Sequence, residues 1–300
     1  MKLICEIQSI AQAQKYCLVS EIAGYLIGLP PYSLDAGIDF TTDDIEKIIK
    51  IGEQTSKMII LNMARLFHED ILEAAFSYAH QWLQSSCVYI QYSDLGLYQL
   101  LSEAGYRDRL IYDAPTYLTN LFDVKLYASI NYRIIVSNQI SIAELKDICH
   151  QSQTFLWIDA FGKSSCFYSK RQLLKNYFLF RNMPQPIGKT YSLQEEFRSE
   201  HYPIIEDATG THVYEATHHC LLAELSQLTQ VECCYLRSIF LSESQFTAVI
   251  DAYRAFLSGN STVEDVLLRF EREAIVISQG AYQSKSILRK HEAGESNETN

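Results

Sequence analysis

The chain has 300 residues, 48% of them hydrophobic and 20% charged, with a formal net charge of −11. This length allows one large α/β domain or two ordinary ones, and the acidic balance without a long run of Lys or Arg argues against a wholly basic nucleic-acid-binding surface. Residues 1–14 hold no secretory hydrophobic region, and the apolar stretch 23–30 is too short to span a bilayer. We expect a cytoplasmic protein with no membrane segment, whose eight cysteines are reduced thiols.

Short apolar runs alternate with helical stretches along most of the chain. The predicted strands are 17–22, 32–38, 57–63, 87–92, 109–114, 133–138 and 155–162. The predicted helices between them include 41–52, a segment that ends near Ala79, 95–104, a segment that starts at Thr116, and 141–150. Short strands separated by helices are typical of successive βα units in a parallel sheet. With an eighth strand at 231–239, the pattern predicts a TIM-like (β/α)8 barrel rather than an open sheet.

The alternation is interrupted before the last predicted strand. Residues 201–216 read as a β-hairpin that turns at 208–210. We interpret 183–217 as an insertion packed on a barrel that spans 1–282. The polar stretch 283–300 is expected to be a disordered tail, because it has too few apolar residues to form a core.

Polar side chains gather where the predicted strands end. In a barrel of this kind, functional groups lie at the carboxyl ends of the strands. The polar residues at those positions are Glu21, Asp35, Asn62, Asp94, Asp113, Asn138, Gln139, Asp159 and Arg237. Each aspartate or asparagine taken alone is explained more simply as the cap of the following helix. Taken together, the set predicts a polar pocket.

Groups suited to covalent or metal chemistry are sparse. Ser169 has no base beside it and is interpreted as a helix N-cap, and Cys166 is interpreted as a small buried side chain rather than an activated thiolate. Histidines and a cysteine crowd into 201–220, but their spacing matches no zinc-ligand pattern. Cys233 and Cys234 are adjacent on a strand and point to opposite faces. We predict no metal site and no bound cofactor.

The run 161–178 leads from a strand through a Tyr-Ser-Lys-Arg step into a helix, and it resembles the central motif of peptidase family U32, the collagenase-like peptidases. Other residues that fit the family's order and spacing, with candidate pocket residues among them, are Asn62, Asp94, Asp113, Ser169, Arg171, Glu206 and Asp207. The resemblance runs roughly from 16 to 256. The resemblance implies a TIM-like barrel and an inherited classification as a peptidase. It also implies kinship with proteins that hydroxylate tRNA wobble uridine, ribosomal RNA or the ubiquinone ring with an iron–sulfur cluster on four cysteines.

Several positions depart from the family pattern. Phe161 stands where the family has the histidine of a His-Gly pair, and Asn138 and Gln139 replace an Arg-Glu pair. Gln172 stands in the place of a cysteine, which leaves Cys166 as the one thiol near the motif. One cysteine cannot hold an iron–sulfur cluster, and amides do not titrate. These exchanges predict a catalytically depleted member of the family.

Three functions are compatible with these residues. The first is a partner subunit in tRNA wobble-uridine hydroxylation, which assembles with a longer, cysteine-bearing U32 homologue and meets tRNA through that partner. The second is a collagenase-like peptidase that uses Asp94, Asp113 and Asp159. The third is a barrel that binds a small molecule without turning it over. The missing ligands favour the first.

Overall fold

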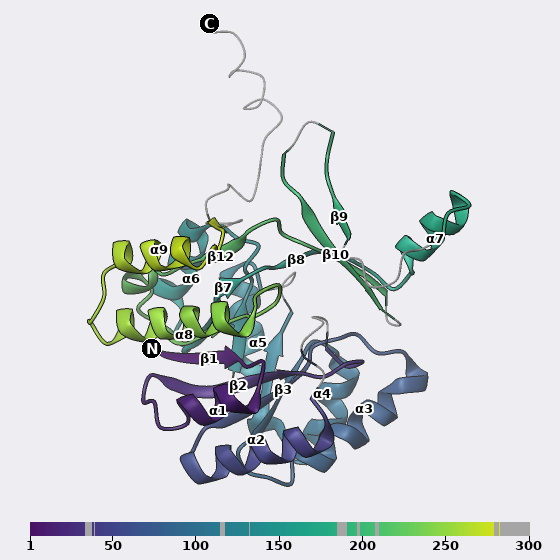
Figure 1. The fold of residues 1–300 in the computed structure, drawn as a ribbon. Coiled ribbons are helices and arrows are strands. Elements are labelled where there is room, and N and C mark those ends of the chain that lie inside the picture. The colour runs from purple at the N-terminus through teal and green to yellow at the C-terminus, as the bar shows by residue number, and fades with distance from the viewer. Residues whose placement is uncertain are drawn as a thin grey trace, which may run out of the picture.

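The structure is a computed structural model that describes residues 1–33, 38, 40–114, 118–131, 133–184, 191–196, 199–207, 210–278 and 282. The barrel strands are β1 (Lys2–Glu6), β2 (Ile22–Gly28), β3 (Met58–Met63), β4 (Val88–Tyr92), β5 (Leu110–Asp113), β6 (Arg133–Val136), β7 (Leu156–Gly162) and β13 (Val231–Leu236). Within the described residues these eight strands run parallel, and β13 pairs with both β1 and β7, which closes the barrel (Figure 1). The predicted TIM-like fold is confirmed.

Helices surround the barrel and follow most of its strands. They are α1 (Ile10–Tyr16), α2 (Thr42–Thr55), α3 (Glu69–Trp82), α4 (Leu95–Glu103), α5 (Leu121–Ile130), α6 (Ile142–Gln151), α8 (Glu243–Leu257) and α9 (Val263–Arg272), with 3-10 turns η1 (Arg107–Arg109) and η2 (Leu225–Gln227). Reciprocal side-chain and backbone hydrogen bonds at Thr41, Ser141 and Ser242 begin α2, α6 and α8. These capping boxes define the residue at which each helix begins. None of the described helices has the length and apolar character needed to cross a membrane.

The barrel interior holds an apolar layer with a polar layer above it. The apolar layer consists of Ile4, Leu26, Ile60, Ile111, Ile135, Trp157, Cys233 and Tyr235. Because side chains alternate across a strand, the residue two positions further along faces inward again, nearer the carboxyl end. On β3, β5, β7 and β13 that residue is Asn62, Asp113, Asp159 and Arg237, and all four are buried. The strand pattern therefore places polar groups at the mouth of the barrel.

The first predicted strand, at 17–22, was misplaced. Residues 17–21 connect α1 to β2, which begins at Ile22. The second predicted strand, at 32–38, falls largely outside the described residues. The N-terminal strand β1 was not predicted. Both β1 and β2 are buried on both faces, so they lack the polar alternation that marks a half-exposed strand. Gly24 in β2 allows close pairing, since a Cβ there would lie 2.4 Å from the Met58 carbonyl oxygen of β3.

A second, antiparallel sheet lies outside the barrel (Figure 1). Its strands are β8 (Ser165–Ser169), β9 (Tyr191–Leu193), β10 (Tyr202–Asp207) and β11 (Gly210–Tyr214), in the order β8-β11-β10-β9, with helix α7 (Leu173–Phe180) after β8. The expected hairpin is formed by β10 and β11, which pair Ile204 with Val213. The sheet starts at Ser165, upstream of the expected insertion at 183–217. Residues 283–300, expected to be a tail, lie outside the described part.

Two further short strands extend the barrel sheet beside β7. β12 (His218–Cys220) pairs antiparallel with the end of β7 and parallel with β14 (Ile277–Ser278). His219 faces Gly162 in this pairing. The strand therefore brings a buried histidine to the edge of the polar layer.

Candidate functional site

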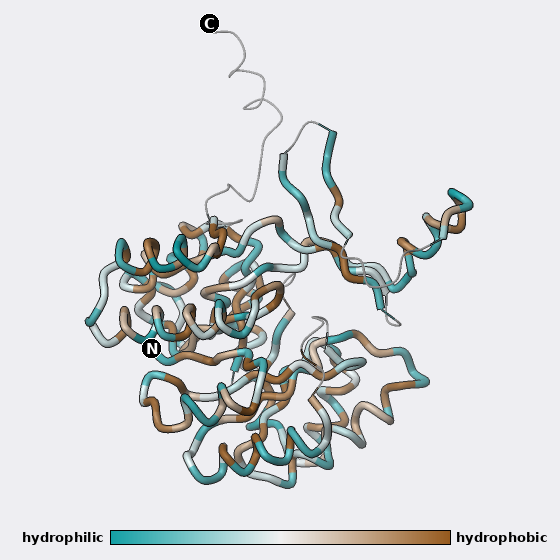
Figure 2. The backbone as a smooth tube through the Cα atoms, in the orientation of Figure 1, coloured by the Kyte–Doolittle hydropathy of each residue, from teal (hydrophilic) through white to brown (hydrophobic). Residues whose placement is uncertain are grey.

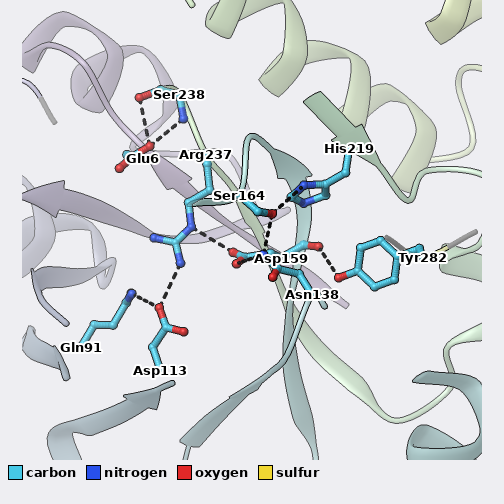
Figure 3. Close-up of polar contacts among 10 residues, drawn as sticks. All are labelled: Glu6, Gln91, Asp113, Asn138, Asp159, Ser164, His219, Arg237, Ser238 and Tyr282. Carbon is cyan, nitrogen blue, oxygen red and sulfur yellow. Dashed lines mark hydrogen bonds and ion pairs between the residues drawn. The ribbon is translucent and has the colours of Figure 1, made fainter. Parts of the chain in front are cut away.

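A cavity of about 60 Å³ lies at the carboxyl end of the barrel strands (Figure 3). Its lining residues are Asn62, Ala64, Gln91, Asp113, Asn138, Asp159, Lys163, Ser164, Ser165, His219 and Arg237. Five of the strand-end residues expected to form a pocket are in this set: Asn62, Asp113, Asn138, Asp159 and Arg237. The polar pocket therefore exists where the sequence pattern placed it.

Arg237 lies at the centre of the cavity wall. Its Nε donates to Asp159 Oδ1 at 2.9 Å and its Nη2 donates to Asp113 Oδ2 at 3.3 Å. Gln91 Nε2 donates to the same Asp113 oxygen at 2.5 Å, and the guanidinium lies 4.7 Å from the ring centre of Tyr235. Arg237 therefore links the end of β13 with Asp159 on β7 and Asp113 on β5, and these contacts hold the polar groups at the mouth in fixed positions.

A second set of hydrogen bonds continues from Asp159 toward β12. Asn138 Nδ2 donates to Asp159 Oδ2 at 3.3 Å and to Ser164 Oγ at 2.9 Å. Ser164 Oγ lies 3.4 Å from His219 Nδ1, and the hydroxyl of Tyr282 donates to the Asp159 carbonyl at 3.2 Å. Asn138 therefore acts as a buried hydrogen-bond bridge between Asp159 and Ser164.

Burial controls the protonation of the groups at the cavity. Burial raises the pKa of Asp113 above its ordinary value, although Arg237 acts in the opposite direction. Burial lowers the pKa of His219 to about 4, so this imidazole is neutral at pH 7. Burial also lowers the pKa of Lys163, whose ammonium donates to the Ala216 carbonyl at 2.7 Å.

Other strand-end residues lie away from the cavity. Asp94 caps α4, accepting from the backbone N–H groups of Leu97 at 2.9 Å and Phe67 at 3.1 Å. Gln139 is half-buried and does not line the cavity; its Nε2 donates to Asn138 Oδ1 at 3.1 Å. Glu21 was expected at a strand's carboxyl end, but it precedes β2 and so lies at the amino end. Asp35 lies outside the described residues.

The four candidates from the family motif, Ser169, Arg171, Glu206 and Asp207, belong to the outer sheet and its connection to α7. Glu206 accepts from the backbone N–H groups of Leu174 at 2.7 Å and Lys175 at 2.9 Å, so it caps α7. Ser169 Oγ accepts from the Arg171 N–H at 3.2 Å, in a turn rather than as the helix N-cap that was expected. The structure does not bring these four residues to the cavity.

Sequence reasoning missed several residues at the mouth. Gln91 stands two positions after Tyr89 on β4, and the same spacing that identifies the other inward residues would have found it. Glu6 ends the unpredicted strand β1 and accepts from the backbone N–H of Ser238 at 2.6 Å. His219 was considered only as a metal ligand. Recognising β1 would have identified Glu6 as a polar residue at the carboxyl end of a barrel strand.

The cysteines do not fit an iron–sulfur cluster. Five of the eight thiols are buried: Cys5 on β1, Cys149 on α6, Cys220 on β12, and Cys233 and Cys234 on β13. Cys166 was expected to be a small buried side chain, but the residue is exposed on β8, and the partial burial of its sulfur raises the pKa of the thiol. Phe161 is buried against His218 at 5.5 Å between ring centres. Cluster ligands must be thiolates gathered at one place, and these cysteines lie on separate elements.

The histidines of 201–220 are likewise dispersed. His212 lies on β11, stacked on Tyr168 at 4.6 Å, whereas His218 and His219 lie on β12. Among the residues that the structure describes, no group of three His, Cys, Asp or Glu side chains is placed to hold a metal ion.

Large apolar side chains of the outer sheet and α7 are exposed. They border a groove of about 710 Å³ between the helix and the sheet, which Phe167, Leu174, Tyr177, Phe178 and Ile204 help to line. No residue of α7 is buried, and Phe180 is 82% exposed. In Figure 1 this helix projects away from the barrel, and Figure 2 shows hydrophobic stretches along it.

The closed βα barrel with a buried polar mouth places this protein among TIM-barrel proteins with a site at the carboxyl ends of the strands. The model of Peptidase family U32 matches residues 13–293, and the chain belongs to that family.

Individual relatives are distant. The chain is 21% identical over 210 residues to tRNA hydroxylation protein P2 of Bacillus subtilis (strain 168), covering 68% of each protein. Among solved structures, it is similar to the U32 peptidase Mk0906, with 11% identity, a TM-score of 0.44, and coverage of 55% of this chain and 70% of the other. Phospho-2-dehydro-3-deoxyheptonate aldolase of Thermotoga maritima gives 15% identity, a TM-score of 0.36, and coverage of 53% and 52%.

Proposed function

We propose that this protein is a cytoplasmic subunit that assembles with a longer U32 homologue and supports hydroxylation of the tRNA wobble uridine, without a redox centre of its own. The similarity to a tRNA hydroxylation protein supports the pathway. The observation that carries the subunit role is the donor set of the central motif. Phe161 and Gln172 occupy positions where the family has a histidine and a cysteine, and Cys166 is the one thiol nearby.

The mouth of the barrel supports binding rather than bond cleavage. Asp113 and Asp159 both pair with Arg237, so one oxygen of each carboxylate is held in an ion pair. Asp94 is used as a helix cap. The peptidase alternative needs these three carboxylates, and their contacts favour a structural or ligand-binding role.

The outer sheet supports assembly with another protein. Exposed apolar patches rimmed by polar groups commonly mark protein–protein contacts. The groove between α7 and the sheet is apolar and open, and the helix makes its capping contacts to Glu206 without burying its own side chains. Exposure of the apolar side chains of α7 to water is unfavourable unless another protein covers them.

Co-purification tests the proposal. The tagged chain and the longer homologue from the same genome would be expressed together under anaerobic conditions, and the complex would be assayed for subunit ratio, iron and sulfide. We expect near-equal amounts of both chains, with iron and sulfide retained when Cys166 is changed to serine. Elution of the tagged chain alone would reject the subunit role. Loss of iron in Cys166→Ser would reject the absence of a redox centre.

A further inference from the structure

The cavity at the barrel mouth contains two buried acceptor atoms without a hydrogen-bond partner among the described residues. They are Gln91 Oε1 and Asp113 Oδ1. Gln91 is 1% exposed and Asp113 is 5% exposed, and both residues line the cavity. A buried acceptor without a partner is unfavourable, so a ligand that donates to both atoms gains binding free energy by satisfying them.

Two buried carboxylates line the cavity and share one guanidinium. Asp113 and Asp159 each pair with Arg237. Lys163 also lines the cavity, but its ammonium donates to the Ala216 carbonyl and not to either carboxylate. Burial is the main cause that raises the pKa of Asp113, and the neighbouring carboxylate of Asp159 acts in the same direction.

The same contacts argue against an anion. The guanidinium of Arg237 already donates to two carboxylates, so an incoming carboxylate or phosphate would place a third negative charge beside this cation. The anion's oxygen atoms would also face Gln91 Oε1 and the ionised Asp113 Oδ1, which accept hydrogen bonds and cannot donate them. An N–H donor meets acceptors that are already in place.

The cavity is small. Its volume of about 60 Å³ is several times the roughly 10–15 Å³ that a single water molecule requires. A ligand group of a few heavy atoms fits, and a nucleobase with its sugar does not.

We propose that this cavity binds a compact organic cation that carries N–H donors, namely an ammonium, amidinium or guanidinium group, with Gln91 Oε1 and Asp113 Oδ1 as the acceptors. The site belongs to the barrel alone, so binding is measured on the isolated full chain and does not depend on the proposed partner subunit.

Isothermal titration calorimetry tests this site with methylammonium, acetamidinium and guanidinium chlorides at matched ionic strength. Sodium chloride, magnesium chloride and sodium acetate serve as reference titrants. We expect saturable binding of at least one organic cation near one equivalent. Absence of saturation with all three cations, or equally tight binding of magnesium or acetate, would overturn the proposal.

Variants locate the binding. Asp113→Asn and Gln91→Met each remove one acceptor and are expected to weaken binding at least tenfold. Asp147→Asn makes the same charge change on the exposed face of α6 and is expected to leave binding unchanged. Gln91→Met keeps the Asp113–Arg237 ion pair, so this variant still tests the location of the ligand if Asp113→Asn fails to fold. Unchanged affinity in a folded Gln91→Met variant would place the ligand elsewhere and overturn the assignment.

Discussion

The barrel mouth and the outer sheet differ in the side chains that they bury and expose. At the mouth, polar side chains from β4, β5, β7 and β13 are buried and fixed by ion pairs and hydrogen bonds between strands far apart in sequence. In the outer sheet, apolar side chains are exposed, and local contacts such as the Glu206 cap of α7 hold the elements. The first arrangement suits a small bound ligand, whereas the second suits a protein surface. Four changes test this contrast.

The largest effect is expected at Arg237. The Arg237→Met variant leaves Asp113 and Asp159 as buried carboxylates without their cation, which should lower the free energy of unfolding by about 3–5 kcal/mol. Urea denaturation measures this change. Arg269→Met removes a surface ion pair with Asp251 and should cost less than about 1 kcal/mol. Equal losses in the two variants would contradict the fixed mouth.

Acidification separates buried histidines from exposed ones. Burial lowers the pKa of His212, His218 and His219 to about 4. The neutral imidazoles therefore contribute fully to stability above pH 6.5, and this contribution is lost as the pH falls toward 4. The loss occurs because these histidines are protonated at a higher pH in the unfolded chain than in the folded protein.

The expected loss is about 2 kcal/mol for one such histidine between pH 7 and pH 5. Asp113 acts in the opposite sense, because its pKa is raised and its contribution is lost as the pH rises. Urea unfolding of the wild type and of His219→Gln at the two pH values should show a smaller drop in the variant. His201→Gln, on an exposed side chain, should match the wild type.

A smaller, local effect is expected at Glu206. The Glu206→Ala variant removes the acceptor for the backbone N–H groups of Leu174 and Lys175, and a lost cap costs about 1 kcal/mol. Hydrogen exchange should accelerate in α7 and remain unchanged in the barrel strands. Glu200→Ala changes an exposed glutamate nearby and serves as the control. Faster exchange throughout the barrel would show that the two regions are coupled.

The smallest effect on folding is expected on the surface of α7. Phe180→Ser changes an exposed side chain, so the free energy of unfolding should shift by no more than about 0.5 kcal/mol. Under the proposed function, recovery of the longer homologue with the tagged chain should fall several-fold. Phe122→Ser, on an equally exposed residue of α5, is the matched control. Recovery that falls equally in both variants would remove the outer sheet from the interface.

Strand periodicity and helix caps were enough to predict the barrel and much of its mouth. Asn62, Asp113 and Asp159 lie in barrel strands and Asn138 just after one, and each is visible as a polar residue after an apolar run. The role of Asp94 was also visible, since an aspartate directly before a helix is an N-cap.

What could not be predicted depends on pairing between distant segments. Glu6 was missed because β1 is a short strand that becomes recognisable only when paired with β13 and β2. Glu206 has a motif-like position, but its role depends on where α7 begins relative to β10. The ion pairs of Arg237 join residues more than a hundred positions apart in one case, and no local pattern reports them.

Analysis of tRNA nucleosides by mass spectrometry tests the central claim most directly. Hydroxylated wobble uridine would be quantified in a strain that lacks this chain, and in that strain complemented with the wild type or with Cys166→Ser. We predict that the modification falls sharply on deletion and that both forms restore it. Unchanged modification after deletion would contradict the assigned pathway, and failure of Cys166→Ser alone would contradict the absence of redox chemistry in this subunit.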